Sequence, residues 1–501
     1  FLSASAQEYF VRGTSTITLE DSWADATEEE RIARVQELVP YKQVVIGYFL
    51  NSYLIDKSSH DDNGDYGGFK ALTKNGSYES LNIRATGELT YAFDFVQEVG
   101  GDLDLLVELG QRANAVPNED GTWTVEVQIG KIGNDEMTQL ELNNEWYRSA
   151  PWSGFNPETV DAERLEAQAL VFEEQERSAD AWIDYDRLIA DGTVDVSIFF
   201  GWDYHDAYHQ KHARTTFLWL LEQGFESPVS DWTEYATARD ALTKTLSVGG
   251  QDVQYNVTLW WGEPGTTTDP DTDAGGIVLE EAMRESLTRD EVIVYSGHSG
   301  PFYGFALGNW KMTAEGDLDD SELAALDMPS DKYQIVLAEG CDTYGIGEAF
   351  WGNPNKADRE SLDIITTTSF SNAGQASTVT DFLGAIAGDD GEGAVEAVRY
   401  STLLRDMDSN AMWFHTMYGV HGIDDNPQGH PFADPTLVCS ECSADADCGV
   451  GGRCVELDGA ASCTYECTAS GGCPGDFECR QTESDGTLGA SYCVPTALTC
   501  G

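Results

Sequence analysis

Residues 291–300 have the sequence EVIVYSGHSG, and residues 333–345 have the sequence YQIVLAEGCDTYG. Each stretch begins with an apolar run typical of a strand buried on both faces and ends in glycine-rich sequence. His298 follows the first run, and Cys341 follows the second. The carboxyl ends of parallel strands share one edge of a sheet, where neighbouring strands lie about 5 Å apart. The pattern therefore predicts that His298 and Cys341 lie close together.

The same alternation of strand and helix extends over residues 186–437. The expected strands are residues 194–200, 253–261, 291–295, 333–338 and 362–367. The expected helices are residues 212–223, 278–287, 321–326 and 379–387. Apolar strands separated by helices predict an α/β domain with a mostly parallel sheet and helices on both faces.

Residues 1–185 differ from this pattern and predict a β-rich α+β accessory domain. Helical spacing of apolar residues, with acidic residues in the first turn, predicts a helix at residues 27–39. Alternating stretches at residues 89–95 and 123–129 predict strands. The apolar run 44–50 is a buried strand or helix segment, and the Glu-rich stretch 159–179 predicts a helix or helical connector. No internal repeat is evident in the chain.

The eleven cysteines are distributed very unevenly. Ten lie in the last part of the chain: Cys439, Cys442, Cys448, Cys454, Cys463, Cys467, Cys473, Cys479, Cys493 and Cys500. This density predicts a small disulfide-rich module at residues 438–501, with five disulfides whose pairing stays open. A zinc site at Cys439 and Cys442 is less favoured, because the segment contains no histidine. Cys341 is then left as the one unpaired thiol.

Disulfides of this number predict an extracellular or cell-surface protein, from which a signal peptide before Phe1 has already been removed. The chain carries 88 acidic and 28 basic residues and a formal net charge of −60. A field of this sign repels nucleic acid and anionic membranes, so neither is an expected partner. No apolar run approaches the roughly 18 residues of a membrane-spanning helix, so we expect no transmembrane segment.

A cysteine next to a histidine is a recognised arrangement for acyl transfer. A free thiol has a pKa of about 8.5, and an adjacent imidazole can remove its proton to give the nucleophilic thiolate. Backbone N–H groups in glycine-rich sequence can stabilise the oxyanion that forms on attack. We therefore predict His298 as general base, Cys341 as nucleophile, and Ser299 and Gly300 as the oxyanion site.

These motifs resemble those of the caspase-hemoglobinase superfamily of cysteine peptidases, which includes caspases, metacaspases, gingipain-like enzymes and CHAT domains. YSGHSG is similar to the family's Tyr-Ser-Gly-His-Gly with one serine inserted, and residues 321–347 resemble the CHAT-type segment that leads into the cysteine. FADPT at residues 432–436 resembles the Gly-Asp-Pro motif that often closes gingipain-type domains. Ser299 stands where the family has glycine after the histidine, and Gly340 stands where alanine is common before the cysteine.

The resemblance covers about half of the chain and implies a caspase-like fold. It also implies a cysteine endopeptidase that acts on peptide or protein substrates and needs no cofactor for catalysis. The family's substrate pocket usually selects one charged residue type, and the candidates for it are Asp342, Glu348 and His205, of which the two carboxylates would suit a basic side chain. The Cys-rich tail resembles modules of secreted bacterial proteins, particularly myxobacterial ones. A non-enzymatic alternative stays open: an inactive caspase-like protein with a structural or adhesive role at a surface or in filaments. Its self-assembly or surface contacts would involve the N-terminal domain or the tail.

Two metal sites are further alternatives. A transition metal would use three histidines that lie close together in sequence: His205, His209 and His212. A structural calcium ion would use carboxylates spaced as in a calcium-binding loop: Asp269, Asp271, Asp273 and Glu280. A second, poorer calcium spacing occurs at Asp61, Asn63 and Asp65.

Overall fold

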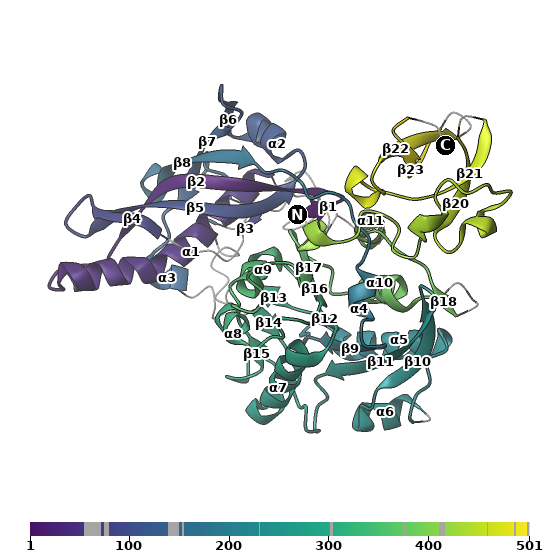
Figure 1. Ribbon diagram of the computed structural model, residues 1–501. Coiled ribbons are helices and arrows are strands. Elements are labelled where there is room, and N and C mark those ends of the chain that lie inside the picture. The colour runs from purple at the N-terminus through teal and green to yellow at the C-terminus, as the bar shows by residue number, and fades with distance from the viewer. Residues whose placement is uncertain are drawn as a thin grey trace.

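The structure is a computed structural model that describes residues 1–54, 72–74, 80–138, 150–152, 155–229, 231–300, 304–374, 376–389, 391, 393–409, 416–457, 459–484, 487–497 and 500. Asp61, Asn63 and Asp65 lie outside these residues. The chain is a mixed α/β protein with two large sheets and a tail of two hairpins (Figure 1).

A nine-stranded mixed sheet forms the largest part of the molecule. Its strands, from one edge to the other, are β1 (Leu2–Ser3), β19 (Tyr418–His421), β17 (Leu362–Thr367), β16 (Gln334–Glu339), β12 (Val292–Ser296), β9 (Thr193–Phe200), β11 (Gln251–Trp261), β10 (Leu242–Val248) and β18 (Ala394–Val395). The strands from β17 to β11 are parallel to one another. The five strands predicted from their apolar runs are these five.

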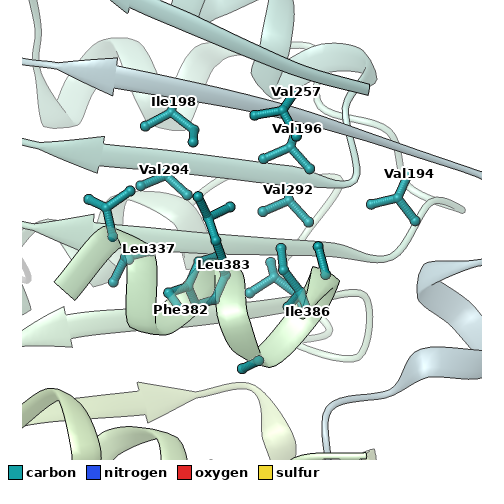
Figure 2. Packing of buried hydrophobic residues seen from close by; sticks show 14 of the residues in the cluster. Val194, Val196, Ile198, Val257, Val292, Val294, Leu337, Phe382, Leu383 and Ile386 are labelled. Atoms are coloured by element: carbon teal, nitrogen blue, oxygen red, sulfur yellow. The ribbon is translucent and has the colours of Figure 1, made fainter. Parts of the chain in front are cut away.

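Helices cover both faces of this sheet, because both faces of its strands are apolar. Val292 and Val294 of β12 belong to one buried cluster, whereas Ile293 and Tyr295 belong to another. The first cluster includes residues of α4 (Tyr185–Leu188), α5 (Tyr208–Glu222), α6 (Trp232–Ala238), α10 (Ser377–Ala387) and α11 (Tyr400–Ser409). The second includes residues of α7 (Asp273–Arg289), α8 (Asp320–Ala325) and α9 (Tyr344–Trp351). Figure 2 shows Leu383 and neighbouring α10 side chains against the valines of β12 and β9.

A small three-stranded sheet follows β12 and shapes the segment after His298. Its strands are β13 (Ser299–Gly300), β14 (Gly304–Ala306) and β15 (Asp317–Leu318). β13 and β14 pair antiparallel, with Ser299 opposite Phe305. Ser299 and Gly300, which follow His298, are therefore held by pairing with β14.

The N-terminal region is an antiparallel seven-stranded sheet. Its strands are β2 (Ala6–Thr18), β3 (Leu72–Lys74), β4 (Ser80–Ala85), β5 (Thr90–Asp102), β6 (Asn114–Pro117), β7 (Trp123–Gly130) and β8 (Leu165–Glu174). Its helices are α1 (Glu28–Leu54), α2 (Leu105–Arg112) and α3 (Asn134–Thr138). The predicted helix at residues 27–39 and the apolar run 44–50 form one helix, α1, whose apolar face packs with the strands in a single buried cluster.

The predicted helix at residues 159–179 is wrong, because the middle of this segment, Leu165–Glu174, is the strand β8. Gln168, Leu170 and Phe172 are buried at alternate positions, which is the period of a strand. β8 pairs with β2 on one side and β7 on the other. This pairing outweighs the helical tendency of the Glu, Ala and Leu residues in the segment.

Segments near both ends of residues 1–185 belong to the nine-stranded sheet and its core. β1 pairs with β19 in the nine-stranded sheet, and Ala181 and Ile183 belong to the same buried cluster as β9 and β12. The proposed domain limits, 1–185, 186–437 and 438–501, stay a prediction.

The tail consists of two disulfide-linked hairpins. The first joins β20 (Gly452–Leu457) to β21 (Ala460–Tyr465), and the second joins β22 (Phe477–Ser484) to β23 (Thr487–Pro495). The pairs are Cys442–Cys454, Cys448–Cys463, Cys467–Cys479, Cys473–Cys493 and the closing pair Cys439–Cys500. The predicted disulfide-rich region is confirmed.

The tail also contains a repeat, so the expectation of no internal repeat is wrong. Both hairpin units have the spacing Cys-x5-Cys-x5-Cys, and in each unit the first cysteine pairs with the third and the second with the fourth. A 3-10 helix precedes each hairpin, at Asp445–Cys448 and at Ser470–Gly472. Within the described residues, no helix has the length and apolar character needed to cross a membrane.

Candidate functional site

Three neighbouring parallel strands bring the candidate residues to one edge of the large sheet. β9, β12 and β16 are adjacent, and each ends at this edge. Asp203 follows β9, His298 follows β12, and Cys341 follows β16. The carboxyl edge of a parallel sheet is where reacting groups gather in open α/β folds.

His298 is held in place through its Nε2 atom, its ring and its backbone carbonyl. Its Nε2 lies 3.3 Å from Oδ1 of Asp203. Its carbonyl oxygen accepts hydrogen bonds from the backbone N–H of Ala306 and from the hydroxyl of Tyr295. Its ring stacks on Tyr204, with centroids 4.8 Å apart, and meets Trp310 edge-on at 5.3 Å.

Asp203 sets the tautomer of His298. Burial by itself would raise the pKa of Asp203, but hydrogen bonds from His298, the backbone N–H of Asp206 and His205 hold the pKa well below its usual range. The carboxylate is therefore ionised and can only accept hydrogen bonds. Nε2 of neutral His298 must then carry the hydrogen, which leaves Nδ1 as the basic nitrogen.

The loop that carries Cys341 is attached to the His298 loop. The hydroxyl of Ser299 donates to the carbonyl oxygen of Cys341 at 2.8 Å. The Cys341 thiol lies 3.9 Å from the carbonyl oxygen of Ser371, in the segment that follows β17. Cys341 is a free cysteine and is partly exposed.

The thiol is protonated in the resting protein. Burial and the neighbouring carboxylate of Asp342 raise the pKa of Cys341 to about 12. At neutral pH a nucleophilic thiolate then forms only if a base removes the proton. His298 lies on the adjacent loop, which the hydrogen bond from Ser299 to the Cys341 carbonyl oxygen joins to this one.

Ser299 and Gly340, the two departures from the family pattern, are matched to each other. A Cβ added at Gly340 would lie 2.1 Å from Oγ of Ser299 and 2.8 Å from the carbonyl oxygen of Gly297. The Ser299 hydroxyl therefore occupies the space that an alanine at position 340 would need. The predicted oxyanion residues Ser299 and Gly300 form β13, and the Ser299 side chain is used to hold the Cys341 backbone.

Asp342 follows Cys341 directly in the chain, and its carboxylate acts electrostatically on the thiol. Its backbone is left-handed, with φ of 54°, and burial raises the pKa of its carboxyl to about 7. Glu339 lies on the other side of Cys341 in sequence, is buried, and has a pKa raised to about 7 by burial. Glu348 lies further along α9 and acts electrostatically on Tyr344. Of the two acidic pocket candidates, Asp342 is thus the one adjacent to Cys341.

The N-terminal sheet touches the cysteine loop. The hydroxyl of Tyr344, which opens α9 shortly after Cys341, donates to Oε1 of Glu8 in β2 at 2.8 Å. A Cβ added at Gly100 of β5 would lie 2.5 Å from Cγ2 of Thr368. The N-terminal sheet therefore packs directly against the segments that carry the candidate site.

The three clustered histidines separate into two environments. His205 is half exposed, with Nδ1 2.9 Å from Oδ1 of Asp203. His209 and His212 are buried in α5, and burial lowers the pKa of each to about 4. Nδ1 of His209 accepts the backbone N–H of Asp203. His205 lies close enough to Asp203 and His298 for the three side chains to bind one metal ion. Within the described residues, it does not form such a set with His209 and His212.

The carboxylates with calcium-loop spacing do not converge within the part of the chain that the structure describes. Helix α7 begins at Asp273, and Thr272 caps it by accepting the N–H of Gly275. The chain therefore turns into a helix in the middle of the expected loop. Asp269 accepts the N–H of Gly265, and the remaining three bind elsewhere: Asp271 to Asn309, Asp273 to the N–H of Ala314, and Glu280 to Arg284.

A cavity of about 480 Å³ lies away from this edge, between residues 424–435 and the tail. Asp424, His430 and Tyr465 are among its lining residues, and Asp203, His298 and Cys341 are not. The candidate site therefore rests on the geometry of its side chains and not on this cavity.

Asp203 is the site residue that the sequence prediction missed. It follows the apolar run 194–200, so it had the same signal as His298 and Cys341: a polar residue just after a predicted strand. Comparison of the chain with models of known protein families, with curated proteins and with solved structures found no match.

Proposed function

We propose that the protein is a secreted or surface cysteine endopeptidase with a caspase-like domain and an Asp203–His298–Cys341 triad. The observation that carries the proposal is the Asp203–His298 contact of 3.3 Å beside a loop whose cysteine has no disulfide partner. Asp203 fixes the tautomer that leaves Nδ1 of His298 basic. The Ser299 hydrogen bond keeps the histidine and cysteine loops together.

In the proposed reaction, Nδ1 of His298 takes the thiol proton as Cys341 sulfur attacks the substrate carbonyl carbon. The imidazolium that forms is stabilised by the ionised Asp203 and then gives its proton to the departing amine. Water next attacks the thioester, with His298 again as base, and releases the acid product and the free thiol. The half-buried carboxylate of Asp342 would favour a basic side chain in the substrate.

The non-enzymatic alternative is favoured by the surroundings of the Cys341 thiol, because burial and the Asp342 carboxylate raise its pKa to about 12. A thiol so reluctant to ionise suits a structural residue unless His298 receives its proton directly. The alternative function is a surface or filament-forming protein that retains the fold. The same experiment separates the two.

The test is labelling with a peptide that ends in a thiol-reactive electrophile, followed by mass spectrometry of the adduct. We expect one adduct, at Cys341. His298→Ala should slow labelling by about 100-fold or more, and Asp203→Asn by roughly 10²- to 10⁴-fold, because Asn no longer enforces the tautomer. His430→Gln is the matched control, since its ring lies against Trp182 and Phe432 and away from the triad.

Denaturation without reductant and alkylation of each variant checks that Cys341 is present as a thiol. Wild-type protein that resists the electrophile in its native state, or His298→Ala protein labelled at the wild-type rate, would overturn the enzymatic proposal. Peptide substrates with Arg or Lys before the scissile bond, compared with Leu or Asp, test the role of Asp342.

A further inference from the structure

Three potential metal ligands from two strand ends lie within reach of one ion. Asp203, His205 and His298 each offer one ligand atom, and these three atoms lie within 4.8 Å of one another. The two separations from Oδ1 are 2.9 Å and 3.3 Å. Ligand atoms around a tetrahedral zinc ion, bonded at roughly 2.0–2.2 Å, are about 3.3–3.6 Å apart. Among the described residues, the other sets of this kind consist of cysteines that are in disulfides.

The carboxylate of Asp203 is oriented in advance for this geometry. Its Oδ2 accepts the backbone N–H groups of His205, Asp206 and Tyr208, at 3.0, 3.0 and 3.2 Å. These bonds use one oxygen and turn the other toward the two imidazoles. The side chain is only 5% exposed, so its orientation does not depend on solvent.

The histidines supply a fixed ligand and an accessible one. The ring of His298 is held by Tyr204 and Trp310, whereas the side chain of His205 is 50% exposed. An ion can therefore approach from the His205 side. Lys311 lies 4.0 Å from the Tyr204 ring and opposes a cation locally, but the net charge of −60 attracts cations to the molecule as a whole.

We propose that Asp203, His205 and His298 bind a Zn²⁺-class transition-metal ion, and that the ion inhibits the proposed peptidase by holding His298. On binding, each neutral imidazole moves its one hydrogen to the other ring nitrogen by exchange with solvent: His205 loses the Nδ1 proton and gains one at Nε2, and His298 loses the Nε2 proton and gains one at Nδ1. No net proton is released, and the freed lone pairs bind the metal. A neutral imidazole bound through Nε2 carries its hydrogen on Nδ1. His298 then has no lone pair with which to accept the Cys341 proton. The binding half stands on geometry alone, and the inhibitory half rests on the proposed function.

The binding test uses full-length protein treated with chelator and kept free of reductant, so that the disulfides stay closed. Zn²⁺ is titrated by calorimetry, and Co²⁺ is followed by its visible absorption. We expect one site, weakened by roughly 100-fold or more in His205→Ala and unchanged in His430→Gln. Cys341→Ala should also bind normally, because the free thiol is not a ligand.

Three outcomes would overturn the binding proposal: no binding by wild-type protein, equal affinity in His205→Ala, or loss of the site in Cys341→Ala. These measurements need no peptidase activity, so they fail or succeed independently of the proposed function.

The inhibitory half is read from the rate of Cys341 labelling with and without Zn²⁺, each variant being compared with its own metal-free rate. Inhibition in wild-type protein that disappears in His205→Ala supports it. Unchanged labelling of the metal-bound protein, or peptide hydrolysis that requires the metal, would overturn it.

Discussion

The nine-stranded sheet and the tail from Cys439 onward are held together in different ways. The sheet buries apolar side chains on both faces, in two large clusters. The buried cluster of the tail consists of only Tyr465, Cys467 and Cys493 among the described residues, and its hairpins are two-stranded. A two-stranded hairpin is marginally stable by itself in water, so the disulfides supply what the small core cannot. Where the core suffices, the one cysteine, Cys341, stays a thiol.

The largest effect is expected from reduction of the disulfides. Each closed loop stabilises a chain by about 2–4 kcal/mol, so opening all of those in the tail should unfold it and leave the nine-stranded sheet folded. Limited proteolysis of reduced protein should cut first after Cys439. Alkylation of native reduced protein should modify the ten tail thiols, whereas denatured unreduced protein should show Cys341 alone. A reduced tail that still resists protease would contradict the conclusion that disulfides hold the tail together.

The second-largest effect is expected when a core side chain that packs against the sheet is truncated. Leu383 of α10 is fully buried against the strands, so Leu383→Ala should lower the free energy of unfolding by about 2–5 kcal/mol. Leu218 of α5 is 46% exposed, and Leu218→Ala should change it by no more than about 0.5 kcal/mol. Urea denaturation with the disulfides intact measures both. Equal losses would mean that burial in this sheet does not determine its stability.

Substitutions at Ser299 and Gly340 should have smaller effects on the free energy of unfolding, and the effect of one should depend on the other. Gly340→Ala should cost roughly 1–3 kcal/mol, because its Cβ would lie 2.1 Å from the Ser299 hydroxyl. In a Ser299→Gly background the same change should cost less by about 0.5–2 kcal/mol. Some cost should remain, since the Gly297 carbonyl oxygen is still 2.8 Å away.

Gly384→Ala in α10 is the control for this cycle. An added Cβ there meets nothing within 4 Å, and the change should stabilise the protein by about 0.4–1 kcal/mol. Strictly additive losses in the Ser299 and Gly340 variants would show that the two residues are not matched.

The smallest effect is on the reactivity of the Cys341 thiol. Above pH 7 the Asp342 carboxyl, whose pKa is raised to about 7, is ionised and raises the pKa of the thiol. Asp342→Asn removes that charge and suits the left-handed backbone. Iodoacetamide should therefore react about three- to tenfold faster with the variant at pH 9. At pH 5 the wild-type carboxyl is protonated, so the two rates should converge, and a ratio independent of pH would contradict this.

Much of the large sheet was predictable, because its strands are continuous apolar runs and its helices have regular spacing. The same logic failed at β8, where alternation of Gln168, Leu170 and Phe172 was hidden among glutamates and alanines. The disulfide repeat was also present in the sequence as two Cys-x5-Cys-x5-Cys units, but equal spacing does not say which sulfurs meet.

The candidate site was predictable only in part. His298 and Cys341 follow apolar runs, and their loops do lie side by side. Asp203 also follows an apolar run, residues 194–200, but the nearby histidines suggested a metal site and drew the prediction away from it. For the carboxylates with calcium-loop spacing, the sequence pattern was misleading. The spacing suggested one loop around an ion, but the chain enters helix α7 at Asp273, in the middle of that loop.

The sequence by itself determined the strands of the parallel sheet, the disulfide-rich tail and the presence of one unpaired thiol, because apolar periodicity and cysteine number are local properties. Only the tertiary structure decided which strands are neighbours, and hence that Asp203 meets His298 and that Ser299 fills the space beside Gly340. Those contacts join residues 95 and about 40 positions apart, and their distances depend on how the whole sheet assembles.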